Sequence, residues 1–179
     1  MKKIPTIFLR DFANNPQFVT TQWHSECEWV RDGEGRATLK HDGTSCLVRD
    51  GKLYKRREVK PGQNEPPDFE SLGTDPETGK TVGWVPVSPD DPNDRWHREG
   101  FTGQSDGTYE LMGPKVQGNR ENLNKHHLLK HGGILLIDAP RTFDELRVYL
   151  DQNVIEGIVW HHPDGRMAKI KRRDFGFRW

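Results

Sequence analysis

The stretch ATLKHDGTSC, residues 37–46, contains two short strand-like segments on either side of Asp42-Gly43. Asp-Gly is the strongest short signal for a β-hairpin turn. The same dipeptide recurs at 32–33, 50–51, 106–107 and 164–165. Between these turns lie six stretches with strand composition: RATLKH (36–41), TSCLVR (44–49), KLYKRREV (52–59), TYELMG (108–113), IEGIVWHH (155–162) and MAKIKRR (167–173). The chain is therefore predicted to form mostly antiparallel sheet.

Helical patterns are fewer. Thr142 and Glu145 have the spacing of a capping box, and Phe143, Leu146 and Leu150 then line one face. This predicts a helix over residues 143–152. A weaker helical pattern covers 122–130. The predicted class is α+β, with antiparallel sheets and a few covering helices.

The length of 179 residues predicts a single domain over 1–179. The segment 61–103 is rich in Pro, Gly and Asp and holds one strand-like stretch, VGWVPV (82–87). We interpret this segment as an ordered excursion with long loops, because neither flank looks self-sufficient.

The composition predicts a soluble protein, because no apolar run approaches the roughly 20 residues of a membrane span. The start, MKKIPTIFLRDF, is interrupted by Arg10-Asp11 and is interpreted as a mature N-terminal segment rather than a signal peptide. Cys27 and Cys46 have no metal-binding pattern and are expected to be free thiols in a reducing cytoplasm.

The net charge is zero, but the charges are unevenly distributed. Acidic residues dominate 65–106, whereas basic residues dominate 115–131 and the tail RMAKIKRRDFGFRW (166–179). Such a chain can present a positive face to a polyanion. A solvated basic tail without a partner explains the same pattern equally well.

Lys40 lies between Leu39 and the Asp-Gly turn. A lysine amine attacks phosphorus or carbon only when it is deprotonated, which a pocket with nearby cations favours. An exposed lysine on a hairpin is the alternative, and for Lys40 taken alone it is the better interpretation.

Further motifs along the chain favour a catalytic role for Lys40. The stretch KHDGT (40–44) resembles motif I of the covalent nucleotidyltransferases, the superfamily of polynucleotide ligases and mRNA capping enzymes. In the order of that superfamily follow KRR (55–57), YELMG (109–113) resembling motif III, EGIV (156–159) resembling motif IV, and KIK (169–171) resembling motif V. The stretches CEWV (27–30), GPKVQGN (113–119) and EGIVWHHPDGRMAKIKRRDFG (156–176) resemble the small 5′-3′ RNA ligases related to the vertebrate enzyme. This resemblance covers nearly the whole chain.

The resemblance implies a nucleotidyltransferase (ATP-grasp-like) fold without a C-terminal OB domain, and an ATP-dependent RNA ligase active in RNA repair. It implies ATP as the nucleotide, Mg²⁺ or Mn²⁺, and RNA with 5′-phosphate and 3′-hydroxyl ends, with no membrane and no obligate protein partner. Lys40 is the implied nucleophile that carries AMP, with Lys169 and Lys171 as further catalytic residues. The implied nucleotide-binding residues are Thr38, Leu39, Asp42, Gly43, Arg56, Arg57, Tyr109, Glu110 and Glu156. Because Arg56 and Arg57 alternate along a strand, only one of them can face the pocket.

The C-terminal hairpin supports these roles. If residues 161 and 166 flank the loop at Asp164-Gly165, Glu156 lies opposite Lys171; a slip of two residues places it opposite Arg173. In both registers Glu156, Lys169 and Lys171 share one face. A carboxylate beside lysines suits metal-assisted phosphoryl transfer, with Glu156 as metal ligand. A cross-strand salt bridge on a solvated sheet is the structural alternative.

Other functions remain open. A minimal ATP-dependent DNA nick ligase would use the same chemistry on another substrate. A nucleic-acid-binding module could keep the fold without catalysis, although the presence of all four motif residues, Lys40, Glu156, Lys169 and Lys171, argues against it. Guanylyl transfer, as in mRNA capping, is disfavoured by the closer resemblance to ligases.

Overall fold

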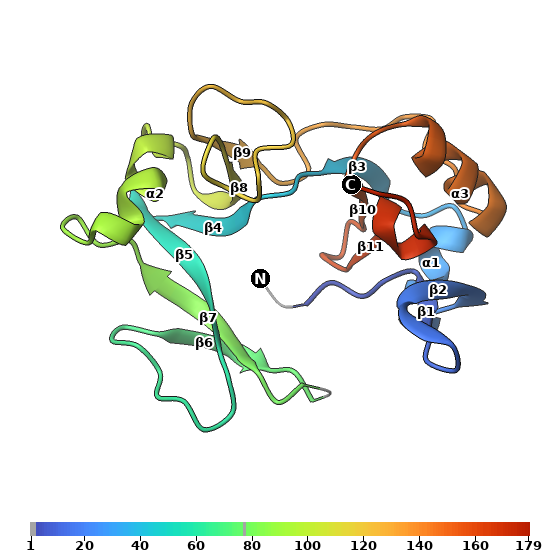
Figure 1. Ribbon diagram of the computed structural model, residues 1–179, viewed down its shortest axis with the longest axis horizontal. Helices are drawn as coiled ribbons and strands as arrows, with labels where there is room; N and C mark the ends of the chain where they lie inside the picture. Colours follow the sequence, from blue (N-terminus) through green and yellow to red (C-terminus); the bar gives the residue numbers. More distant parts are fainter. Residues whose placement is uncertain (1–2, 77) are drawn as a thin grey trace. The chain divides into compact units, whose positions relative to one another are not determined.

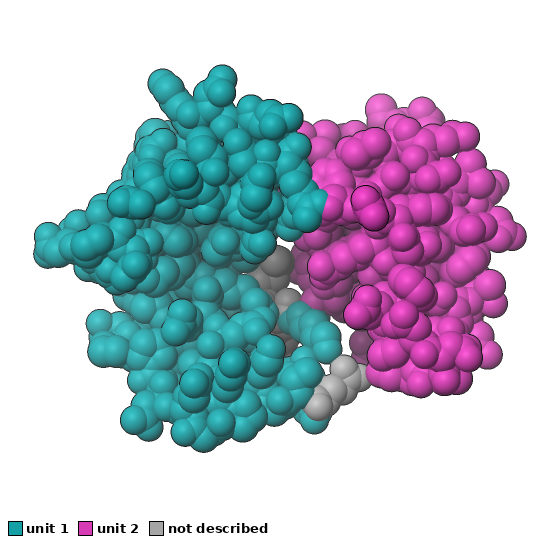
Figure 2. Space-filling view, viewed as in Figure 1, with its two compact units in different colours: residues 1–3, 42–131 teal, residues 4–41, 132–179 magenta. Residues whose placement is uncertain are grey.

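The computed structural model describes residues 3–76 and 78–179. The chain divides into two compact units, shown in teal and magenta in Figure 2. The first unit contains Lys3 and residues 42–131, and the second contains 4–41 and 132–179. The class is mixed α and β with antiparallel sheets and few helices, which agrees with the predicted class at this level. The single-domain assignment for 1–179 stays a prediction.

The first unit is built on a six-stranded antiparallel sheet with the order β6-β7-β5-β4-β8-β9 (Figure 1). Asp50-Gly51 closes the β4–β5 hairpin, and both residues have the positive φ that this turn requires. The core packs Cys46, Leu53, Tyr109, Leu111 and Leu128 together. The elements are β4 (Thr44–Arg49), β5 (Lys52–Val59), β6 (Glu70–Thr74), β7 (Thr81–Pro86), η2 (Pro92–Asp94), α2 (Arg95–Gly100), β8 (Gly107–Met112) and β9 (His127–Lys130).

The helix predicted over 122–130 is wrong. Residues 127–130 form β9, which pairs with β8 through Glu110 and Leu129. Leu128 is buried in the core of this unit. Pairing with the edge of the sheet and burial of Leu128 therefore stabilise a strand here more than the weak local pattern stabilises a helix.

The second unit contains a three-stranded antiparallel sheet with the order β11-β10-β3 (Figure 1). Side chains alternate across the sheet, and one face is core: Ile158, Trp160, Ala168 and Ile170 pack there against Leu146 and Leu150 of α3. The predicted helix over 143–152 is confirmed as α3. The elements are β1 (Phe8–Asp11), β2 (Asn15–Trp23), η1 (Ser25–Cys27), α1 (Glu28–Arg31), β3 (Arg36–Lys40), α3 (Phe143–Gln152), β10 (Gly157–His161), β11 (Met167–Lys171) and η3 (Arg172–Phe175).

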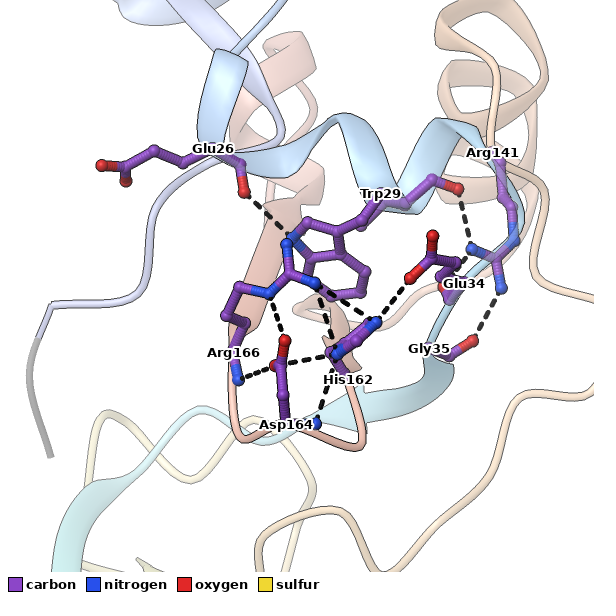
Figure 3. A network of polar contacts seen from close by, with 9 residues as sticks. Glu26, Trp29, Glu34, Gly35, Arg141, His162, Asp164 and Arg166 are labelled. Carbon is purple, nitrogen blue, oxygen red and sulfur yellow. Dashed lines mark hydrogen bonds and ion pairs between the residues drawn. The ribbon is translucent and has the colours of Figure 1, made fainter.

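Polar contacts hold the β10–β11 loop against the segment that leads into β3 (Figure 3). His162 lies 2.5 Å from the Glu34 carboxylate and 2.8 Å from that of Asp164, which also pairs with Arg166. Arg141 donates to the carbonyls of Val30, Glu34 and Gly35. These contacts fix where β3 begins relative to the hairpin.

Asp42-Gly43 does not close a hairpin, contrary to the sequence prediction. β3 pairs with β10, whereas β4 pairs with β5 and β8, so the dipeptide joins strands of two different sheets. Gly43 is needed for close approach: a Cβ there would lie 2.2 Å from the carbonyl oxygen of Leu111. The Gly43 N–H also donates to Glu110.

We expect Gly43→Ala to lower the free energy of unfolding by about 3 kcal/mol, because the new methyl group meets backbone that cannot easily move. Urea unfolding followed by circular dichroism measures this loss. Gly103→Ala is the matched control, since its Cβ meets open space and only the left-handed φ opposes it; that costs about 1–2 kcal/mol. Equal losses in the two variants would contradict the packing argument.

Within the described ranges, no helix has the length and apolar character needed to cross a membrane.

Candidate active site

The three-stranded sheet of the second unit places the motif lysines on one face. In one row of the sheet, Lys171 lies opposite Gly157, which lies opposite Lys40. Two residues further along, in the next row on the same face, Lys169 lies opposite Val159, which lies opposite Thr38. Gly157 leaves the space between Lys40 and Lys171 free of a side chain, and a Cβ there would lie 2.2 Å from the Ile170 carbonyl oxygen. Three amines from two strands therefore converge on the face opposite the core.

Glu156 joins two of these lysines. Its Oε2 lies 2.6 Å from Lys40 Nζ and its Oε1 lies 3.4 Å from Lys171 Nζ, and the carboxylate is only 6% exposed. Both predicted registers were wrong: Gly157, not Glu156, lies opposite Lys171. Glu156 lies in a bend before β10, where the alternation of a strand no longer applies, and the bend turns it towards the lysines.

The lysine side chains are poorly hydrated. Burial, helped by the ammonium groups of Lys171 and Lys40, lowers the pKa of Lys169 to about 7. Burial also lowers the pKa of Lys171, against the opposing effect of Glu156. The site therefore concentrates positive charge where water cannot fully screen it, as an anion-binding site requires.

Lys169 should make stability depend on pH. Its pKa is about 7 in the folded chain and 10.5 when unperturbed. Between these values the unfolded chain binds the proton that the folded chain has lost, so stability rises with pH. We expect the wild type to gain about 2 kcal/mol relative to Lys169→Met between pH 7 and 9.

Urea unfolding of both proteins at several pH values measures this difference. Lys52→Met, at an exposed position of β5, is the control and should show no such pH-dependent difference. A constant difference between the wild type and Lys169→Met would contradict the buried, depressed amine.

Thr38 and Leu39 are consecutive residues of β3, so their side chains point to opposite faces of the sheet. Thr38 is fully buried on the lysine face, donates to the Val159 carbonyl at 3.0 Å and lies 3.1 Å from His161 Nε2. Leu39 pairs with Ile158 on the core face. The structure therefore does not bring the Leu39 side chain to the lysines, and its backbone N–H already donates to Ile134.

In the first unit, two of the predicted residues, Gly43 and Glu110, contact each other. Glu110 accepts from the Gly43 N–H at 3.0 Å and lies 2.8 Å from His131 Nε2. Tyr109 points the opposite way, into the core, where its hydroxyl donates to the Ser105 carbonyl. The structure thus separates Tyr109 from Glu110.

The remaining predicted residues of this unit are Asp42, Arg56 and Arg57. Asp42 lies 3.7 Å from Arg120. Arg56 and Arg57 face opposite sides of β5, as predicted; Arg56 pairs with Glu58 at 2.9 Å, and Arg57 is exposed. Which of the two meets a nucleotide stays open.

Sequence reasoning missed two charged residues, Arg10 and Asp174. Arg10 lies 2.9 Å from the buried carboxylate of Asp174, which also accepts a hydrogen bond from the Lys171 N–H. No motif marked Arg10, because its partner lies at the other end of the chain.

Arg172 of the basic tail is not a free surface cation, because it donates to the Asp151 and Asn153 carbonyls at the end of α3.

A metal ion was predicted at Glu156. Among the described residues there is no group of three or more His, Cys, Asp or Glu side chains that could form a protein cage. Mg²⁺ commonly binds through one carboxylate together with substrate phosphates and water. Glu156 fits that mode and no other.

Comparison with known proteins finds similarity to RNA ligases over part of the chain. Residues 101–179 match the family model described as RNA ligase 1. The matched region contains Glu110, Glu156, Lys169 and Lys171, whereas Lys40 precedes it. This match confirms the resemblance to RNA ligases for residues 101–179, and not for nearly the whole chain.

Curated relatives carry the same name. RNA ligase 1 of Danio rerio is 29% identical over 139 residues, which cover 58% of this chain and 43% of that protein. RNA ligase 1 of Pongo abelii is 25% identical with the same coverage. RNA ligase 1 of Mus musculus is 35% identical over 81 residues, covering 40% of this chain and 25% of that protein. The chain thus aligns with less than half the length of these relatives.

Proposed function

We propose that this chain is an ATP-dependent RNA ligase that joins 5′-phosphate and 3′-hydroxyl ends through a lysyl-AMP intermediate. The observation that carries the proposal is that Lys40, Lys169 and Lys171 share one face of a sheet, with the buried Glu156 carboxylate paired to Lys40 and Lys171. The proposal includes a nucleotidyltransferase fold for the antiparallel sheets. It also includes a reducing, cytoplasmic location, which agrees with the free, buried Cys27 and Cys46.

Lys40 performs the first step. Its Nζ loses a proton and attacks the α-phosphorus of ATP; a P–N bond forms, the bond to the β-phosphate oxygen breaks, and pyrophosphate leaves. Glu156 Oε2, 2.6 Å from Nζ, is within reach of that proton. In the later steps AMP passes to the RNA 5′-phosphate, and the 3′-hydroxyl then displaces it.

Lys169 and Lys171 stabilise charge. Negative charge builds up on the phosphate oxygens during each transfer, and preorganised cations in a poorly hydrated site stabilise it more than water does. Lys171 also balances Glu156 while Lys40 is engaged, because it contacts the other carboxylate oxygen. A Mg²⁺ or Mn²⁺ ion at Glu156 would supply further charge neutralisation to the phosphates.

The test is incubation of the protein with α-labelled ATP or GTP, followed by denaturing electrophoresis. We expect covalent label from ATP and much less from GTP. Ligation is then assayed with single-stranded RNA, nicked RNA and nicked DNA side by side. Absence of covalent label would overturn the proposal, and preference for nicked DNA would replace RNA with DNA as substrate.

A further inference from the structure

The lysine face of the second unit extends beyond β11. Thr6 forms a parallel bridge with Lys169, because the Lys169 N–H donates to Pro5 and the Ile7 N–H donates to Lys169, both at 2.9 Å. Bridged residues point to the same side of a sheet. Thr6 therefore stands beside Lys169, while Ile7 enters the core.

Arg10 reaches the same place from β1. Its Nη2 donates to the Thr6 hydroxyl at 3.3 Å, and its Nη1 donates to the Gln17 carbonyl at 2.8 Å and lies 2.9 Å from Asp174 Oδ1. The Arg10 side chain is 28% exposed, whereas that of Asp174 is only 1% exposed. The buried carboxylate thus fixes a guanidinium that solvent, or a ligand, can still reach.

The charges around this point do not balance. The cations are Lys40, Lys169, Lys171 and Arg10, and the carboxylates that contact them are Glu156 and Asp174. Lys169 contacts neither carboxylate within ion-pair distance among the described residues, and its pKa is depressed to about 7. An anion beside Lys169 would relieve this excess of positive charge.

We propose that Thr6, Arg10 and Lys169 form a second phosphate subsite, one row away from the Lys40–Glu156 pair. The subsite rests on the proposed function and takes a phosphate group other than the α-phosphate that Lys40 attacks. A hydroxyl donor, a guanidinium and an amine are the groups that bind phosphate oxygens in proteins. The phosphate belongs either to the leaving pyrophosphate of ATP or to the RNA end.

Direct binding tests the subsite without catalysis. Calorimetry measures the affinity of inorganic pyrophosphate for the wild type, Arg10→Gln and Thr6→Val, with Arg31→Gln as matched control. Arg31 lies on α1 in the same unit and pairs with Asp32 and Glu28 rather than with any residue of the proposed subsite. We expect an affinity loss of about 10–100-fold for Arg10→Gln and a smaller loss for Thr6→Val.

Arg10→Gln also removes the partner of Asp174 and could unfold the protein. Thr6→Val preserves that ion pair and the side-chain shape, so its loss of affinity alone supports the subsite. Unchanged affinity in Thr6→Val, or equal losses in Arg10→Gln and Arg31→Gln, would overturn it.

Two activity assays identify the phosphate. If it belongs to ATP, the Thr6 and Arg10 variants raise the ATP concentration needed for covalent labelling and seal pre-adenylated RNA normally. If it belongs to RNA, labelling is normal and sealing of pre-adenylated RNA falls. A wild type that binds pyrophosphate through Arg10 yet forms no covalent label would overturn the proposed function and leave the subsite standing.

Discussion

Lys40→Arg is expected to lose covalent AMP completely while the protein stays folded. A guanidinium remains protonated at any pH at which the protein is folded, so it cannot attack phosphorus. It does preserve a cation beside Glu156, whose carboxylate lies 2.6 Å from the native amine. Loss of a covalent nucleophile typically lowers rate by about 10⁶-fold, which is below detection in a labelling assay.

Electrophoresis after incubation with α-labelled ATP measures the loss, and circular dichroism verifies folding. Lys52→Arg is the matched control, because Lys52 is an exposed lysine at the start of another strand, β5. It should label like the wild type. Clear labelling of Lys40→Arg would show that another residue carries AMP.

Glu156→Gln is expected to lower the rate of ligation by about 10²–10³-fold, the usual effect of losing one preorganised electrostatic contact. The amide keeps the size of the side chain but removes the charge shared by Lys40 and Lys171. It also removes the proposed acceptor for the Lys40 proton and the proposed oxygen ligand for a metal ion, so added Mn²⁺ should restore activity only in part.

Breaking a buried ion pair typically costs about 3–5 kcal/mol. The assays therefore need a temperature well below the unfolding transition of Glu156→Gln. Glu28→Gln, at an exposed position of α1, is the control with the same chemical change. If Glu156→Gln ligates as fast as Glu28→Gln, the contacts of Glu156 with Lys40 and Lys171 serve only as a structural salt bridge.

Lys171→Met separates the steps within the same experiment. It keeps Glu156 paired with Lys40 and removes one cation from the face proposed to hold the phosphate. We expect it to fail in formation of lysyl-AMP and to retain part of the sealing of pre-adenylated RNA. Equal loss in both assays would place Lys171 at a step that they share.

Local sequence predicted α3 and the strands β3, β4, β5, β7, β8, β10 and β11, but not β1, β2, β6, β9, α1 or α2. β5 matches KLYKRREV at both ends, and α3 begins and ends where the apolar positions Phe143, Leu146 and Leu150 required. Such segments fold as expected because their own periodicity matches the surface that they bury. The helix predicted over 122–130 did not form, because its apolar periodicity was weak and residues 127–130 pair with strand β8 instead.

The sequence by itself determined that Lys169 and Lys171 share a face, since alternation in a strand follows from covalent geometry over two residues. Only the tertiary structure decided that Lys40 meets Glu156 and that Arg10 meets Asp174. It also decided that Glu156 reaches Lys171 through a bend rather than through the strand register, and that Asp42-Gly43 joins two sheets. These outcomes depend on which distant strands pair, and that is set by burial of a shared core rather than by any short stretch of the chain.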